Sequence, residues 1–246
     1  MSMEQRKLPT VLDLRALKGQ KQLTMLRYFS LDEAAAAEAA GIDIASVPAE
    51  ILFHPRYREV APSIFSMAGQ THTECGTPHE YFKWCNSAIE RGADAVYCGN
   101  SPAYIEALRN EGLPAVSHIG LIPYKNTWTG GFKAVGKDAE SAFKVYQDAL
   151  AYDSAGAIGL EVECVPDRVA EMITKKVDLL TLSMGSGPKC DVEFLFIQDV
   201  IGTNTDRVPK HAKVFKDTNK SYDNLLNDTV EGLKKFVSDV NSKEFP

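Results

Sequence analysis

Short runs of apolar and β-branched residues alternate along this chain with longer segments in which apolar residues recur at helical spacing. Eight such runs occur, at residues 23–28, 42–47, 63–68, 95–98, 115–119, 157–163, 179–184 and 194–198. A strand followed by a helix, repeated along a chain, is typical of parallel βα units. The pattern therefore predicts an α/β protein with eight parallel strands.

Signals at the ends of the helical segments agree with this pattern. In a capping box, two side chains satisfy backbone donors that a helix start leaves free. Two boxes are expected, one from Ser30 with Glu33 and one from Thr77 with Glu80. Residues 138–153 are predicted to form a helix that ends before Gly156, and the last helix is predicted over residues 222–240.

Eight parallel strands could form an open, doubly wound sheet or a closed barrel. An open dinucleotide-binding sheet carries Gly-x-Gly-x-x-Gly after its first strand, and this chain has no such motif there. The strand count therefore favours a (β/α)8 TIM barrel, a single domain over residues 1–246 in which residues 1–20 form an N-terminal extension leading into the first strand. In such barrels the functional residues lie where the strands end.

Composition narrows the classes of function. The formal net charge of -6 argues against nonspecific binding of nucleic acid. Residues 1–10 lack an apolar signal segment, and no window approaches the roughly 18 apolar residues of a membrane span, so we expect a cytoplasmic protein with no membrane partner. The five cysteines include no Cys-x-x-Cys pair, which argues against a disulfide framework and a zinc knuckle.

Two acids stand out at the end of the sixth predicted strand. Strand alternation places Glu161 and Glu163 on the same face. If that face is the barrel interior, both carboxyl groups are removed from water together, so one should pair with a cation or have a raised pKa suited to a general base. Arg27 in the first strand is a possible partner for Glu161, whose alternative role is a structural ion pair.

Other candidates allow a functional and a structural interpretation. His118 follows an apolar run, so it could contact a substrate or be a hydrogen-bonded core histidine. His72, Cys75 and His79 are closely spaced, but a surface loop explains them better than a metal site. Tyr124 and Trp128 could cover a pocket or serve in packing.

Several motifs in the second half of the chain resemble ketopantoate hydroxymethyltransferase. The matching segments are His118-Ile119-Gly120-Leu121 with Pro123, Gly130-Gly131-Phe132-Lys133 with Gly136, Glu163-Cys164-Val165-Pro166, Met184-Gly185-Ser186-Gly187, Asp191, Gln198-Asp199, and Val208-Pro209-Lys210 with Ala212-Lys213. The similarity extends over about residues 20–240. That family belongs with the phosphoenolpyruvate mutase and isocitrate lyase barrels.

The resemblance implies a specific reaction. Members of the family transfer a hydroxymethyl group from methylenetetrahydrofolate to 2-oxoisovalerate beside a magnesium ion. It implies that Glu163 is the base, that His118 contacts the substrate, and that the protein forms a homo-oligomer.

The first half of the chain departs from the family at the metal site. The family's Asp after the second strand is Ala49 here, and its Asp after the third strand is Gly69. The family's Lys-Ile-Glu-Gly after the fourth strand is replaced by residues 97–100, Tyr-Cys-Gly-Asn. Magnesium needs several oxygen ligands, so a metal is doubtful unless Glu50 and Glu163 rebuild the site.

Three hypotheses follow from these residues. The first is a transferase or aldolase that acts on a small 2-oxo acid with Glu163 as base. The second is a carbon–carbon lyase or decarboxylase acting on another small carboxylate. The third is a noncatalytic barrel that binds a metabolite or a partner protein. The residues expected to bind the substrate are Glu161, Arg27, Tyr97, Gln70 and Glu50.

Overall fold

Eight parallel strands close into a barrel in the computed structural model, which describes residues 6–69, 75, 77–204, 208–218 and 225–245. The strands follow one another around the barrel in chain order. They are β1 (Leu23–Arg27), β2 (Ile44–Pro48), β3 (Phe65–Gly69), β4 (Ala95–Tyr97), β5 (Ala115–Gly120), β6 (Gly159–Glu163), β7 (Leu180–Met184) and β8 (Val192–Phe196). The predicted single-domain (β/α)8 barrel is confirmed, and each predicted strand overlaps an observed one.

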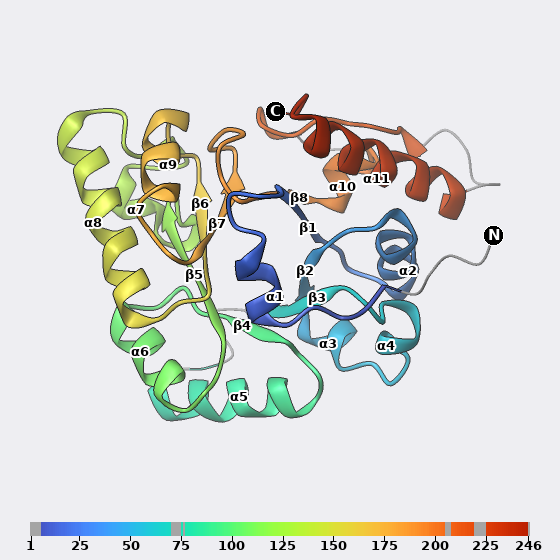
Figure 1. The fold of residues 1–246 in the computed structure, drawn as a ribbon, viewed down its shortest axis with the longest axis horizontal. Coiled ribbons are helices and arrows are strands. Elements are labelled where there is room, and N and C mark those ends of the chain that lie inside the picture. The colour runs from blue at the N-terminus through green and yellow to red at the C-terminus, as the bar shows by residue number, and fades with distance from the viewer. Residues whose placement is uncertain (1–5, 70–74, 76, 205–207, 219–224, 246) are drawn as a thin grey trace.

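Helices surround the barrel and begin at the expected places (Figure 1). Thr77 and Glu80 form a reciprocal capping box, whereas Ser30 caps its helix alone because Glu33 instead accepts a hydrogen bond from the backbone of Phe29. The helices are α1 (Val11–Ala16), α2 (Leu31–Ala40), α3 (Ala49–Leu52), α4 (Tyr57–Val60), α5 (Pro78–Glu90), α6 (Pro102–Asn110), η1 (Pro123–Lys125), α7 (Asn126–Thr129), α8 (Ala139–Ala155), α9 (Asp167–Thr174), α10 (Ile197–Val200) and α11 (Leu225–Ser242).

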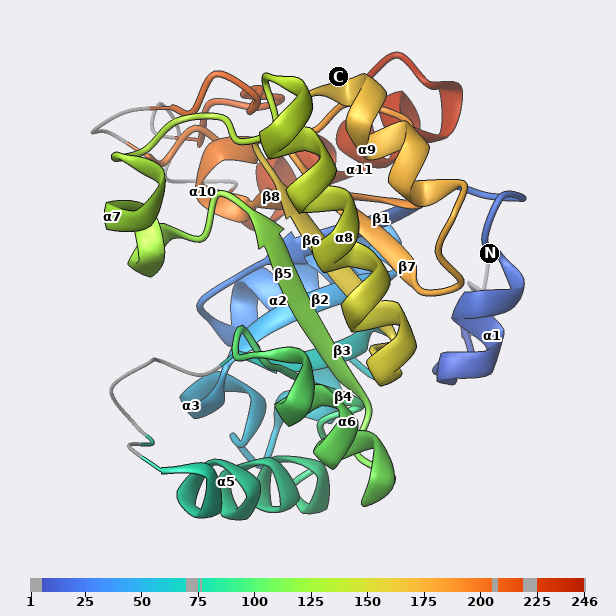
Figure 2. The ribbon, with the colours of Figure 1, turned by 90° about the vertical axis from the view of Figure 1, so that its left-hand side faces the viewer.

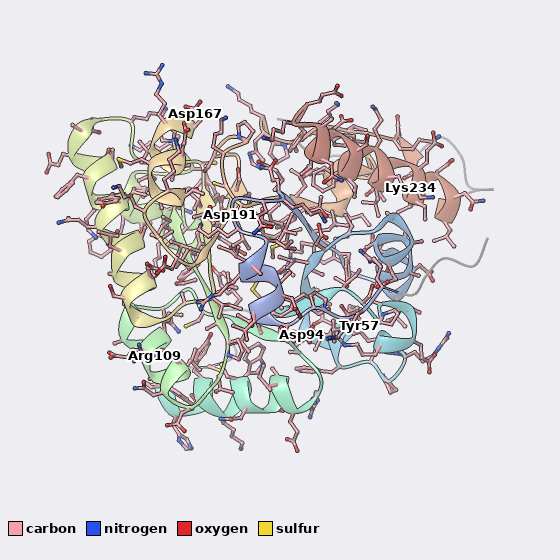
Figure 3. The ribbon with its side chains drawn as sticks, in the orientation of Figure 1. Tyr57, Asp94, Arg109, Asp167, Asp191 and Lys234 are labelled. Carbon is pink, nitrogen blue, oxygen red and sulfur yellow. The ribbon has the colours of Figure 1, made fainter. Side chains whose placement is uncertain are left out.

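The connection between β7 and β8 differs from the predicted alternation. Residues 185–191, all of them described, form a loop without a helix. Asp191 at its end accepts hydrogen bonds from the backbone and side chain of Thr181 and pairs with Lys18 at 2.6 Å (Figure 3). These contacts tie the start of β8 to β7 and to the segment after α1, so a crossover helix is not needed to hold the strand in place.

Side chains that point into the barrel divide it into an apolar lower part and a polar upper part. Alternation along each strand places every second residue inside. Leu14 of α1 joins the lower core from the end of the barrel where the strands begin, and Figure 2 shows α7 at the opposite end. The lower part is filled by Leu23, Met25, Ile44, Phe65, Met67, Ala95, Val116, Leu180, Leu182, Val192 and Phe194. A closed floor therefore lies beneath a polar layer at the carboxyl ends of the strands.

A chain of buried polar groups fixes the outer side of β3. The hydroxyl groups of Tyr28 and Tyr57 lie 2.6 Å apart, and that of Tyr57 lies 2.6 Å from Oγ of Ser66. The backbone N–H of Ser66 donates to Asp94 at 2.7 Å, and Arg58 pairs with the same carboxylate at 2.7 Å (Figure 3). Buried polar groups are stable only when they are paired, so this network specifies how α4 packs on the barrel.

None of the helices in the described part of the chain combines the length and the apolar character needed to cross a membrane.

Candidate active site

A cavity of about 420 Å³ opens at the carboxyl ends of the strands, above the apolar floor. Its wall brings together Arg27, Tyr97, His118, Glu161 and Glu163, all of them sequence-predicted site residues. The rest of its lining is Ser46, Gly69, Pro123, Tyr124, Met184, Phe194 and Phe196. The volume is in the range of pockets that bind small metabolites.

Two predicted site residues are not part of this lining. Glu50 lies in the first turn of α3, where its side chain is exposed to solvent. Ala49 begins this helix immediately after β2, and Glu50 is still near enough for its charge to act on Arg27. Gln70 lies outside the described residues, as does His72 of the histidine–cysteine cluster, whose His79 is exposed in the first turn of α5.

His118 lies between the two acids predicted to share a strand face. Residues 118 and 161 are partners in the β5–β6 register, and Gly120 pairs with Glu163. The ring Nδ1 of His118 is 3.3 Å from Oε2 of Glu161, and its Nε2 is 3.2 Å from Oε2 of Glu163. The hydroxyl of Tyr97 lies 3.0 Å from the same Nδ1. Paired strands thus hold an imidazole between two carboxyl groups.

Burial changes the acid–base properties of this group. The side chains of His118, Glu161 and Glu163 are only 4%, 8% and 12% exposed. Burial raises the pKa of Glu161 to about 7, an effect that the charge of Glu163 reinforces and that His118 and Arg27 oppose. Burial also raises the pKa of Tyr97 well above its ordinary value, so its hydroxyl stays protonated at neutral pH. The site therefore has an acid that gains and loses a proton near neutrality.

The backbone around Glu163 is tightly constrained. The carbonyl of Glu163 accepts a hydrogen bond from Leu121 at 2.9 Å, and a Cβ atom on Gly120 would overlap that carbonyl oxygen. Cys164 follows with a φ of 51°, a conformation that is uncommon for residues other than glycine. Such strain is often found beside functional side chains. Here it fixes the backbone position of Glu163 at the end of β6.

Arg27 is the cation of the site. Its Nη1 donates to Oγ of Ser46 at 2.8 Å, and its guanidinium carbon lies 5.4 Å from the ring centre of Phe29 and 5.8 Å from that of Phe196. A Cβ atom on Gly69 would lie only 2.9 Å from Nη1. The missing side chain at Gly69 therefore provides the space that the guanidinium occupies.

The loop after β5 forms one side of the cavity. The hydroxyl of Tyr124 and Nζ of Lys125 each donate to the carbonyl of Gly99 at 2.8 Å, which pins the loop to the end of β4. A side chain on Gly99 would meet the hydroxyls of Tyr124 and Tyr97. Of the two aromatic residues proposed to cover a pocket, Tyr124 lines the cavity, whereas Trp128 is 91% exposed.

The residues present do not fit the magnesium ion that the resemblance implies. At the two positions where the family has Asp, Ala49 offers no ligand oxygen and Gly69 no side chain. The space next to Gly69 holds the cationic guanidinium of Arg27, which would repel a second cation. The described part of the chain also contains no group of three His, Cys, Asp or Glu side chains arranged to bind a metal.

A smaller cavity of about 160 Å³ lies beside the helix-free connection between β7 and β8. It is lined by Ser183, Gly185, Gly187, Glu193, Phe194, Leu195, His211 and Phe245. Burial raises the pKa of Glu193 to about 9, and it lowers the pKa of His211. These two residues were not singled out from the sequence. The only sequence signal for Glu193 is an ionisable residue at an outward position of a strand, which normally indicates exposure, and His211 lies in the loop between α10 and α11.

The sequence also gave no indication of Ser46 as a site residue. It is an inward position of β2, and its role depends on Arg27, which lies 19 positions earlier in the chain. Met184 and Phe196 are the inward residues at the ends of β7 and β8 and complete the apolar side of the cavity.

Comparison with known proteins finds sequence similarity to one group of enzymes. The family described as "Ketopantoate hydroxymethyltransferase" matches residues 75–246. The 3-methyl-2-oxobutanoate hydroxymethyltransferase 1 of Methylibium petroleiphilum is 33% identical over 270 residues, covering 98% of this chain and 88% of the relative. A 3-methyl-2-oxobutanoate hydroxymethyltransferase of Bacillus cereus is 38% identical over 160 residues, which is 64% of this chain and 55% of that enzyme.

Solved structures share the fold. A phosphonopyruvate hydrolase in complex with oxalate and Mg²⁺ superposes with a TM-score of 0.57 at 14% identity, over 79% of this chain and 84% of that one. The family match begins at residue 75, so it excludes β1, β2 and β3. Arg27, Ser46 and Gly69 lie outside the residues that the family model matches, although the Methylibium petroleiphilum relative aligns over 98% of this chain.

Proposed function

Because this chain belongs to the ketopantoate hydroxymethyltransferase family, we propose that it transfers a hydroxymethyl group to a small 2-oxo acid, with Glu163 as the base. The observation that carries this proposal is the contact between Glu163 and His118 in a cavity with an apolar floor and a cationic wall. The relatives that support it are transferases named for the same substrate class, 3-methyl-2-oxobutanoate.

The first step of the reaction is removal of a proton from C3, the carbon next to the ketone. A carboxylate oxygen of Glu163 takes this proton, and the electrons of the C–H bond form the C2–C3 double bond. The ketone oxygen then carries the negative charge, which requires donors that are already in position. The guanidinium of Arg27 and the protonated hydroxyl of Tyr97 are donors on the cavity wall.

In the second step, the nucleophilic C3 of the enolate attacks a one-carbon unit at the oxidation level of formaldehyde, which one water would release from a nitrogen-bound methylene donor as its C–N bonds break. The new C–C bond forms as the C=O π electrons of that unit move to its oxygen, which takes a proton and becomes the hydroxyl group. The ketone is restored as the electrons return from the enolate oxygen. The donor implied by the resemblance, methylenetetrahydrofolate, stays a prediction. We propose that the proton on Glu163 moves away from the substrate through His118, whose Nε2 lies 3.2 Å from Glu163 without a hydrogen bond to it in this structure and whose Nδ1 lies 3.3 Å from Glu161. Glu161, with a pKa of about 7, is suited to hold that proton at neutral pH.

The cavity limits the substrate to a small acid with an apolar side. Met184, Phe194 and Phe196 form an apolar wall, and Arg27 lies on the polar side. A branched 2-oxo acid would place its alkyl group against this apolar wall and its carboxylate near Arg27. This division supports a substrate resembling 3-methyl-2-oxobutanoate more than a dicarboxylic acid.

A lyase or decarboxylase would share the enolate and also the donors Arg27 and Tyr97. The transferase consumes a one-carbon donor together with the acid, whereas the lyase consumes the acid alone. A single assay can therefore distinguish the two activities. The protein is incubated with a set of 2-oxo acids and ¹³C-labelled methylenetetrahydrofolate, and the products are followed by NMR. A new ¹³C-hydroxymethyl signal that is absent with Glu163→Gln supports the transferase. Consumption of the acid without the one-carbon donor supports the lyase, and binding without turnover of any acid contradicts both enzymatic proposals.

A further inference from the structure

Arg27 is a partly buried cation with unused hydrogen-bonding capacity. A guanidinium has five N–H donors, and among the described residues Arg27 makes one hydrogen bond, to Ser46. No carboxylate of the described residues forms an ion pair with it, and Glu161 instead contacts His118. Burial lowers the pKa of Arg27, an effect that the charges of Glu161 and Glu50 oppose. A partly buried charge without a direct partner is costly, which indicates that an anion binds there.

The guanidinium is also held in one place. Ser46 fixes one nitrogen, the rings of Phe29 and Phe196 flank the group, and Gly69 leaves the space into which it fits. Aromatic rings attract a guanidinium through their faces, so these contacts restrict its rotation without using its N–H donors. The remaining donors can therefore reach a ligand in the cavity that Arg27 lines.

From this arrangement we infer that Arg27 replaces the divalent cation of the family: its guanidinium binds the carboxylate of the 2-oxo acid and stabilises the enolate, so the site works without a metal. The inference rests on the proposed function, because it names the group that holds the substrate of that reaction. It also accounts for the loss of Asp at position 69, since an acid there would meet the guanidinium of Arg27 and pair with it.

The chemistry of a guanidinium fits this role. It presents two parallel N–H groups to a carboxylate, and it keeps its charge at any pH at which the protein is folded. It carries one positive charge where a magnesium ion carries two. The enolate is therefore stabilised less strongly by the cation alone, and the neutral donor Tyr97 contributes a larger share.

Binding measurements test this inference without a readout of turnover. Isothermal titration calorimetry is performed with 3-methyl-2-oxobutanoate and with oxalate, an enolate analogue, in buffer with EDTA and in buffer with Mg²⁺. The wild-type protein is expected to bind both acids in EDTA, with a Kd that Mg²⁺ changes by less than about twofold. Arg27→Met is expected to weaken binding on the order of 10- to 100-fold, the usual effect of losing charge-assisted hydrogen bonds. Arg27→Lys keeps the charge but loses the paired donors. Its Kd is therefore expected to lie between those of the wild type and Arg27→Met.

Arg56→Met is the matched control, because Arg56 is exposed and pairs only with the exposed Glu59 among described residues. It should bind both acids as the wild type does. Binding that requires Mg²⁺, or an unchanged Kd in Arg27→Met, would overturn the inference. The EDTA comparison uses the wild-type protein, so it gives an answer even if the Arg27 variants do not fold. Mg²⁺-dependent binding together with hydroxymethyl transfer would overturn only the role of Arg27, whereas metal-free binding without any transfer would contradict the proposed function instead.

Discussion

Nε2 of His118 lies 3.2 Å from Oε2 of Glu163 across the paired strands β5 and β6. Because both residues belong to regular strands, the barrel itself sets this distance, and no mobile loop is involved. The other ring nitrogen contacts Glu161. An imidazole that joins two carboxyl groups is suited to move a proton between them, and this property underlies the predictions below.

Replacing His118 should change the titration of Glu161. His118 lowers the pKa of Glu161, which burial raises to about 7. In His118→Gln the pKa of Glu161 is therefore expected to rise further, so the carboxyl group stays protonated to higher pH. NMR titration of ¹³C-labelled glutamate side chains measures this value directly. The control is Glu161→Gln, in which the resonance titrating near pH 7 should disappear, and a resonance that persists would refute the assignment.

Glu193 should make the protein less stable as the pH rises. Its pKa is about 9 in the folded state and near 4.5 when unfolded, so between these values the unfolded state releases a proton that the folded state retains. Stability from this group is thus present at low pH and lost as the pH rises toward 9. Glu193→Gln removes the effect, and we expect it to raise the free energy of unfolding at pH 8.5 by on the order of 1–3 kcal/mol, with little change at pH 5.

Urea denaturation at the two pH values checks this prediction. Glu90→Gln is the control, because Glu90 is an exposed acid at the end of α5. Its substitution should change stability by less than about 0.5 kcal/mol at either pH. Equal effects of Glu193→Gln at pH 5 and pH 8.5 would show that the buried acid is not protonated as described.

Gly120 should be indispensable for the position of Glu163. A methyl group at Gly120 would overlap the Glu163 carbonyl oxygen, and its φ of 84° adds strain for any other residue. We expect Gly120→Ala to lower kcat by about 100-fold, because small displacements of a catalytic group have effects of that size. Gly112→Ala is the control, since Gly112 has a φ of 73° but no atom within 4 Å of the added methyl group. Gly112→Ala should keep the wild-type kcat, and a Gly120→Ala variant that is equally active would contradict the prediction.

The barrel could be predicted from the sequence because strand and helix periodicities are local properties. Each predicted strand was found, but the last was placed two residues late, since Glu193 is an ionisable residue that is nevertheless buried on the outer side of β8. The absence of a helix between β7 and β8 depends on Asp191 and its contacts with Thr181 and Lys18, which no local pattern reveals.

The candidate site was predicted where alternation decides the direction of a side chain. Glu161 and Glu163 share a face for that reason, and the cavity contains both. Glu50 is exposed in the first turn of α3 and is not part of the cavity lining, so its predicted role in substrate binding stays a prediction. The position of the Arg27 guanidinium could not be predicted, because it depends on three strands: Arg27 on β1, Ser46 on β2 and the missing side chain of Gly69 on β3.

The most direct test of the account is hydrogen exchange at C3 of the 2-oxo acid. The protein is incubated with 3-methyl-2-oxobutanoate in D2O without a one-carbon donor, and the C3 proton signal is followed by ¹H NMR. Wild-type protein should replace this proton with deuterium, and Glu163→Gln should slow the exchange by at least about 100-fold while binding the acid with a similar Kd. Exchange by Glu163→Gln at the wild-type rate would show that Glu163 is not the base.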